Sequence, residues 1–189
     1  MSRFELALVC LAASMPCLHG CVPVVVAGAG GAVMMSEDRR TTGTIVDDQT
    51  IEGRARSRIE DKYDDRVHVD LASYNRFILL VGEVPDQQTK DDIGAIALGV
   101  ENVRNVQNEL IIGPNTSGST RANDAYLTSK VKARFVSENK FKANHVKVIT
   151  ENSTVYLLGL VKREEGDAAA DIESTTAGVQ KVIKVFEYI

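Results

Sequence analysis

The stretch Leu79-Leu80-Val81-Gly82-Glu83-Val84 recurs later in the chain as Tyr156-Leu157-Leu158-Gly159-Leu160-Val161. In both stretches an apolar run crosses a glycine, which is typical of a buried strand. A second pair follows in the same order, because residues 99–106 and 178–185 both read Gly-Val-x-x-Val-x-x-Val. Two matches in the same order are hard to obtain by chance, so we infer an internal repeat.

Helices and further strands can be placed around these stretches in each copy. Apolar residues recur every four positions at 51, 55 and 59 and again at 127, 131 and 135, which predicts a striped helix over residues 48–66 and 123–142. Short alternating patterns at 67–69 and 146–148 predict strands. Residues 86–98 and 162–177, rich in Ala, Asp, Glu and Lys, predict second helices. Each copy therefore reads helix, strand, strand, helix, strand.

The doubled unit resembles tandem BON domains, with V-G-x-V ending the second strand in the first copy, L-G-x-V in the second, and G-V-x-x-V-x-x-V leading into the last strand of both. This resemblance implies an α+β fold in which each domain is a small mixed sheet covered on one face by two helices (αββαβ), and an extra leading strand is compatible with it. We expect a first domain over residues 47–113, a turn-rich linker over 114–122 and a second domain over 123–189.

The first twenty residues have the pattern of a signal peptide. The apolar run at residues 6–15 is too short to span a bilayer. Leu18 and Gly20 ahead of Cys21 resemble the bacterial lipobox, with His19 where a small residue is usual. We expect a signal peptide over residues 1–20, a Cys21 carrying fatty acyl chains such as palmitate, and a tether over 21–46. Plain secretion or a buried thiol is the alternative.

Composition limits the classes of function. Net charge is −4, whereas a general nucleic-acid binder needs a cationic excess, so we expect no nucleic-acid partner. His68 and His145 lack metal-ligand spacing and read as surface residues beside strands. No phosphate loop or nucleophile motif is apparent in the sequence. The sequence therefore predicts a non-enzyme with no metal and no cofactor.

The two leading helices differ in charge. Residues 48–66 hold six acids and five bases, whereas residues 123–142 hold two acids and five bases. Each base near an anionic lipid surface contributes about 1 kcal/mol. Tyr126, Lys130 and Arg134 follow at four-residue spacing beside the apolar stripe, and an aromatic ring with cations suits a membrane interface. We expect Asn123 or Asp124 to cap this helix.

The family resemblance implies a non-enzymatic outer-membrane lipoprotein whose BON domain binds phospholipid and supports outer-membrane integrity. The lipobox resemblance implies that Val22, rather than an aspartate, after the cysteine favours the outer membrane, so we expect an anchor on its periplasmic face. The expected partner is an anionic phospholipid such as phosphatidylglycerol. The alternative is an adaptor that holds an envelope assembly protein and uses its lipid only as a tether. The implied phospholipid-binding residues, which open with Asn-Asp-x-aromatic and place Tyr where Trp is expected, are Asn123, Asp124, Ala125, Tyr126, Lys130 and Arg134.

Overall fold

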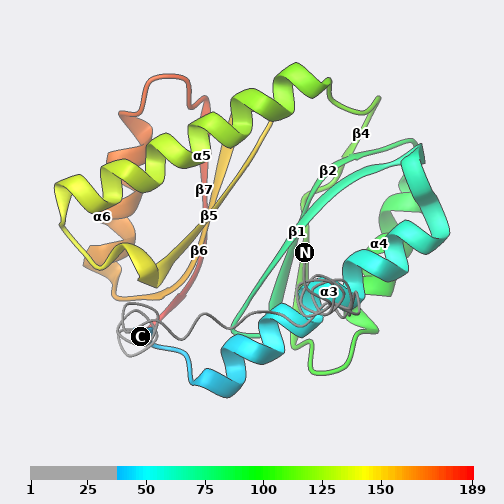
Figure 1. The fold of residues 1–189 in the computed structure, drawn as a ribbon, viewed down its shortest axis with the longest axis horizontal. Coiled ribbons are helices and arrows are strands. Elements are labelled where there is room, and N and C mark those ends of the chain that lie inside the picture. Colours follow the sequence, from blue (N-terminus) through cyan, green and yellow to red (C-terminus); the bar gives the residue numbers. More distant parts are fainter. Residues whose placement is uncertain (1–37) are drawn as a thin grey trace, which may run out of the picture. The chain divides into compact units, whose positions relative to one another are not determined.

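A computed structural model describes residues 38–189 (Figure 1). The predicted signal peptide, Cys21 and most of the predicted tether lie outside the described residues. The first copy contains α3 (Thr42–Tyr63), η2 (Asp64–Arg66), β1 (His68–Tyr74), β2 (Phe77–Val84), α4 (Gln87–Leu98), β3 (Asn105–Asn108) and β4 (Ile111–Ile112). The second contains α5 (Gly118–Glu138), η3 (Ala143–His145), β5 (Val146–Glu151), β6 (Thr154–Val161), α6 (Arg163–Ser174) and β7 (Lys181–Tyr188). The predicted αββαβ order is confirmed in both copies.

Each copy forms a mixed sheet around its apolar central strand. In the first copy, β2 pairs antiparallel with β1 and parallel with both β3 and β4. In the second, β6 pairs antiparallel with β5 and parallel with β7. The last strand is continuous in the second copy and split into β3 and β4 in the first. Within residues 38–189, no additional strand precedes α3.

Both leading helices begin earlier than the sequence predicts. The Thr41 hydroxyl accepts the Thr44 amide at the start of α3, and the Ser117 hydroxyl accepts the Thr120 amide at the start of α5. The expected cap at Asn123 or Asp124 is therefore wrong. The stretch after Pro114 has the composition of a flexible linker. A single capping hydroxyl nevertheless stabilises the first turn of a helix there. The helices thus begin inside the ranges predicted for tether and linker.

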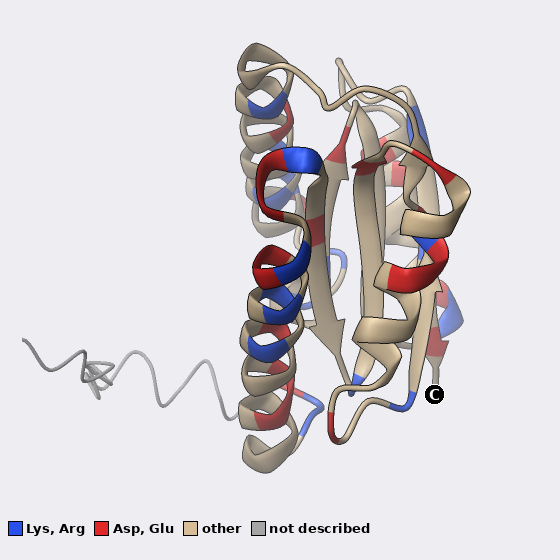
Figure 2. Cartoon of the chain, turned by 90° about the vertical axis from the view of Figure 1, so that its right-hand side faces the viewer, with Lys and Arg blue, Asp and Glu red and all other residues tan. Residues whose placement is uncertain are grey.

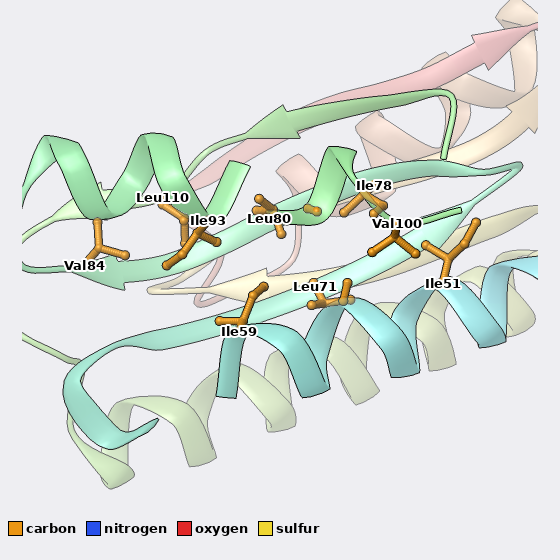
Figure 3. Close-up of a cluster of buried hydrophobic side chains, with 11 residues drawn as sticks. Ile51, Ile59, Leu71, Ile78, Leu80, Val84, Ile93, Val100 and Leu110 are labelled. Atoms are coloured by element: carbon orange, nitrogen blue, oxygen red, sulfur yellow. The ribbon is translucent and has the colours of Figure 1, made fainter. Parts of the chain in front are cut away.

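The predicted helix stripes pack against one face of each sheet. Ile51, Ala55 and Ile59 of α3 are buried and share a core with β2 and α4. Figure 3 labels Ile51 and Ile59 in this core. Leu127, Val131 and Phe135 of α5 are buried as well. The four-residue stripes of the sequence are therefore confirmed as the helical half of each core.

The other faces of the two central strands share a third core. Leu79 and Val81 of β2 cluster with Tyr156 and Leu158 of β6, and all four are buried. The Tyr74 hydroxyl donates to the His145 carbonyl oxygen at 3.3 Å, which adds a polar link beside this core. The two sheets therefore pack on each other through side chains that alternate with those beneath the helices.

The segment just before α3 is bonded to both copies. The Arg39 guanidinium donates to Glu165 of α6 at 2.6 Å, and the Arg40 guanidinium donates to Asp48 of α3 at 2.9 Å. Arg40 also lies over the Tyr74 ring, 3.9 Å from its centroid. Residues 38–41 fall within the range predicted as a tether, and they are part of the folded body instead.

Two glycines at equivalent places in the repeat have a common cause. A Cβ at Gly82 would overlap the carbonyl oxygen of His68, and a Cβ at Gly159 would overlap that of His145. Gly82 also has a φ of +120°, where side chains are strained. These glycines let the neighbouring chain approach closely where β1 begins and just before β5 begins, which explains why the sequence repeats them.

Gly82→Ala should lower the free energy of unfolding by about 2–3 kcal/mol, because the added methyl meets backbone that cannot move aside. Gly53→Ala is the matched control, since Gly53 lies exposed within α3 with nothing near its would-be Cβ. That change should raise the free energy of unfolding by about 0.5–1 kcal/mol. Urea unfolding followed by circular dichroism measures both, and equal shifts would contradict this account.

Buried aspartates on the leading helices hold the hairpin turns. The Asp48 carboxylate accepts the amides of Asn75 and Arg76, and the Asp124 carboxylate accepts the amides of Asn152 and Ser153 at 2.9 Å each. All four turn residues have positive φ. The carboxylates satisfy amides that a tight turn leaves without strand partners.

Asp124→Ala should lower the free energy of unfolding by about 3 kcal/mol, because it leaves two turn amides without their charged acceptor. Asn123→Ala, one residue earlier on the exposed side of α5, should change it by less than about 0.5 kcal/mol. Thermal and urea unfolding of the two variants test the assignment. A similar loss in both would show that the helix, not the carboxylate, is responsible.

Glu173 of α6 is fully buried, and neither of its carboxylate oxygens has a hydrogen-bond partner among residues 38–189. Burial raises the pKa of Glu173 to about 8 from an ordinary value of 4.5. The folded chain therefore keeps a proton that the unfolded chain releases. Stability falls as pH rises from about 4.5 to about 8.

Glu173→Gln should remove the contribution of Glu173 to that slope, which is at most about 1.4 kcal/mol per pH unit, and should make the protein more stable near pH 8. A smaller slope below about pH 7 should remain, because burial also raises the pKa of Glu151. Glu101→Gln, whose side chain is 72% exposed, is the control and should leave the slope unchanged. Unfolding free energies measured from pH 5 to pH 8 decide the matter. An identical pH slope in the parent chain and Glu173→Gln would refute the assignment.

Candidate functional site

The outer face of α5 is an exposed line of small and apolar residues. Tyr126 is 64% exposed and Val136 is 69% exposed, which is unusual for apolar side chains of this size. Ala122, Ser129 and Ala133 lie between and before them at three- and four-residue spacing, on the same face of the helix. We call the five residues Ala122, Tyr126, Ser129, Ala133 and Val136 the α5 outer face.

Basic residues flank this face on both sides. At about 100° per residue, Lys130 lies to one side of the line, and Lys132 and Arg121 lie to the other. The two acids of α5 do not offset them, since Asp124 is buried and Glu138 accepts from Arg134 at 2.5 Å. Proximity of the Arg134 guanidinium lowers the pKa of Glu138, so this acid stays ionised and paired. The surface of α5 is therefore apolar along its centre and cationic at its edges.

The residues predicted from the sequence divide into two groups. Asn123, Ala125 and Tyr126 are exposed at the first turns of α5. Asp124 faces inward and holds the turn after β5, so its carboxylate is not available to a headgroup. Cys21 lies outside the described residues.

Lys130 and Arg134 are turned toward α6 and are half-buried. The Lys130 ammonium donates to the Ala177 carbonyl oxygen at 2.8 Å, and the Arg134 guanidinium donates to the Ile172 carbonyl oxygen at 2.5 Å. Arg134 thus satisfies a carbonyl in the last turn of α6, and Lys130 satisfies one in the loop that follows α6. Because each four-residue step advances about 40° around the helix, Arg134 has drifted about 80° away from Tyr126. Tyr126, Lys130 and Arg134 therefore do not form the single straight stripe that the sequence predicts, because the two cations lie toward α6.

Five residues on or beside this face were not among those predicted from the sequence: Val136, Ala133, Ser129, Lys132 and Arg121. A seven-residue periodicity counted from Ala122 would have identified the exposed face. This periodicity applies only if the helix begins by residue 118. An expected helix start at Asn123 concealed the first turn. The periodicity is present in the sequence, but it was not recognised because the helix was predicted to begin too late, at Asn123.

The repeat provides an internal comparison for this face. Placing Asp124 on Asp48 aligns Tyr126 with Thr50 and Val136 with Glu60. The equivalent face of α3 begins with the exposed Val46, continues through Thr50, Gly53 and Ser57, and ends in the acid Glu60, so it has no aromatic residue and no apolar side chain at its C-terminal end. Figure 2 shows that acidic and basic residues are interspersed along α3. The two leading helices have the same core and different surfaces, so the surface of α5 is not required by the fold.

A cleft of about 560 Å³ opens beside the inner side of α5. Residues of β1 and β5 line it together with the first turns of α5, among them His68, Asp70, Arg121 and Glu151. His68 is half-buried, as a residue at a strand end, whereas His145 is 7% exposed, so the expectation that His145 is a surface residue is wrong. Burial, reinforced by nearby Glu83, raises the pKa of Glu151 to about 7.

Within residues 38–189, no helix combines the length and apolarity needed to cross a bilayer.

Comparison with known proteins agrees with this architecture. The BON domain family model matches residues 47–114 and 123–189. The chain is 42% identical to Outer membrane lipoprotein DolP of Haemophilus influenzae over 91% of this chain and 90% of that protein. It is 32% identical to the 21 kDa hemolysin of Actinobacillus pleuropneumoniae over 80% of this chain and 79% of that protein.

Among solved structures, the chain overlaps with CdsD, a structural protein of the Type III secretion system of Chlamydia trachomatis. Sequence identity there is 12% and the TM-score is 0.30, over 72% of this chain and 91% of that one. The doubled sheets, the matched BON models and the relative at 42% identity together establish that the chain belongs to the BON-domain family, as a dual BON-domain protein related to the outer-membrane lipoprotein DolP.

Proposed function

We propose that this protein is anchored through lipidated Cys21 at the periplasmic face of the outer membrane and binds anionic phospholipid with the α5 outer face, in support of outer-membrane integrity. The observation that carries the proposal is the exposure of Tyr126 and Val136 on one line of α5 between flanking cations. Such a face buries apolar side chains at headgroup depth while its cations meet phosphates. The proposed role is binding, and no catalytic step is part of it.

The charge of α5 supports an anionic lipid over a zwitterionic one. Lys132 is exposed and Lys130 and Arg121 flank the same face, whereas both acids of the helix are engaged within the protein. Each cation near an anionic surface contributes about 1 kcal/mol. The exposed Lys132 and Arg121 therefore favour phosphatidylglycerol by about 2 kcal/mol before the burial of Tyr126 is counted, and the half-buried Lys130, which is bonded to Ala177, adds less.

The acyl anchor and the helix face have complementary tasks. An acyl chain fixes the protein at the membrane, since each buried CH₂ contributes about 0.8 kcal/mol. A helix face that binds weakly on its own then acts at a high local concentration of headgroups. Recognition of the headgroup therefore rests with α5, and retention rests with Cys21.

Tyr126→Glu should weaken binding to phosphatidylglycerol vesicles by about 10- to 100-fold, because it removes a buried ring and adds repulsion. The chain carries Cys21→Ser in this experiment, so that no acyl chain contributes. Thr50→Glu is the matched control, since Thr50 is exposed at the equivalent position of α3. Vesicle co-sedimentation at low and high salt measures the loss, and binding should weaken as salt rises.

Equal losses in Tyr126→Glu and Thr50→Glu, or no binding to anionic vesicles by the parent chain, would refute the proposal. The adaptor then becomes the better interpretation. Exposed Leu98, Ile111 and Ile112 in the first copy favour that alternative, because a short apolar strand at a sheet edge can receive a partner protein. Pull-down of an envelope assembly protein by the Tyr126→Glu variant would support it.

A further inference from the structure

Three side chains that the lipid-binding proposal does not use converge beside the cleft. One potential ligand atom from each of His68, Glu83 and Glu151 lies within 4.8 Å of the other two. His68 and Glu83 are cross-strand partners on β1 and β2, and Glu151 is the last residue of β5. The cluster therefore draws two ligands from the first sheet and one from the second. We call these three residues the His68–Glu83–Glu151 cluster.

Both carboxylates of the cluster are buried and only partly satisfied. Glu83 is 4% exposed and Glu151 is 6% exposed. The Oε2 of Glu83 accepts the Thr116 amide at 3.0 Å, and the Oε2 of Glu151 lies 3.4 Å from the His68 Nε2. The Oε1 of each has no hydrogen-bond partner among the described residues and is shielded from solvent. Two buried acids with unused oxygens are costly unless a cation completes them.

The surroundings of the cluster add further negative charge. Asp70 and Asp124 act on Glu151 as like charges, and Arg121 is the cation that opposes them. The cleft of about 560 Å³ is lined by His68 and Glu151 and provides a route for a hydrated ion. The cluster thus combines unsatisfied buried ligand atoms, an excess of negative charge and access from water.

We propose that His68, Glu83 and Glu151 bind a divalent transition-metal cation, of which Zn²⁺ is the best match. One imidazole nitrogen and two carboxylate oxygens form a ligand set that Zn²⁺ accepts. Ca²⁺ and Mg²⁺ prefer shells made of oxygen alone. The fourth ligand is a water molecule from the cleft.

A cation at this place would join the two BON domains. Glu151 comes from the second sheet, whereas His68 and Glu83 come from the first. A bond from each sheet to one ion stabilises the shared core of β2 and β6 against separation, since a ligand that binds only the folded state favours that state. The site therefore has a structural role in the packing of the two domains.

The test uses the full chain with Cys10→Ser, Cys17→Ser and Cys21→Ser, because thiols also bind zinc. Titration with Zn²⁺ in a calorimeter should give one site per chain. The melting temperature should rise by about 5 °C at a hundredfold excess of Zn²⁺ over its Kd. Ca²⁺ and Mg²⁺ at the same concentration should leave the melting temperature unchanged. Co²⁺ in place of Zn²⁺ should give visible absorption bands that report four or five ligands.

Glu83→Gln and Glu151→Gln keep the shape of each side chain and remove its charge. Each should reduce Zn²⁺ affinity at least about tenfold, in the range seen when a partner of a metal site is lost. Asp70→Asn is the matched control, because Asp70 lines the same cleft and lies outside the cluster. That variant should retain Zn²⁺ affinity within about threefold. His68→Asn provides the same test from β1 if a glutamine variant fails to fold.

Failure of the parent chain to bind Zn²⁺ at one site would overturn the proposal. So would equal affinity in the parent, Glu151→Gln and His68→Asn chains. An equal loss in Asp70→Asn and Glu151→Gln would show that Zn²⁺ senses only the charge of the cleft, which also overturns the site. Because none of these changes lies on the α5 outer face, vesicle binding remains a separate measurement.

Discussion

The central strand of each sheet is apolar on both of its faces, and this is the constraint from which the rest of the structure follows. In β2, Ile78 and Leu80 lie beneath the helices while Leu79 and Val81 face the other sheet. In β6, Val155 and Leu157 alternate with Tyr156 and Leu158 in the same way. Neither sheet can leave its second face in water, so each copy covers the other. Two BON domains that are separate in the sequence therefore share one core.

The two copies share the residues that the fold requires, and they differ at positions that the fold does not constrain. Gly82 and Gly159 allow the same close approach of strands, and Asp48 and Asp124 hold the same hairpin turn. Such positions cannot vary without a loss of stability. The outer faces of the leading helices carry no such requirement, and there the copies have diverged. A functional difference between the domains is therefore expected on those faces, and Tyr126 of α5 is the residue proposed to contribute to it.

The sequence predicted the parts of the fold that depend on local periodicity. The stripes at Ile51, Ala55 and Ile59, and at their equivalents on α5, were recognisable because every fourth residue returns to nearly the same face of a helix. The order of strands followed from the repeat. The continuous apolar runs in β2 and β6 also indicated strands buried on both sides, from which stacked sheets could have been inferred.

Local periodicity could not predict features that depend on a single hydrogen bond or on strands that come together from distant parts of the chain. The caps at Thr41 and Ser117 are ordinary hydroxyls in stretches that resemble linkers. His68 showed no metal-ligand spacing because its neighbours Glu83 and Glu151 come from other strands, and Glu151 comes from the other domain. Sequence spacing finds ligands on one helix or loop, and it cannot find ligands that a shared core assembles.

Helix α5 lies between the two candidate sites and relates them physically. Its inner side lines the cleft with Arg121 and Asp124, while its outer face carries Tyr126 and Val136. Charge bound at the His68–Glu83–Glu151 cluster would act on the field at the first turns of α5, where Arg121 flanks the outer face. At physiological ionic strength, screening confines such an effect to about 8 Å in solvent, although less so through the protein interior. The cationic edge nearest the cleft is therefore the part of the α5 surface that would sense a bound metal, whereas the apolar centre of the α5 outer face would not.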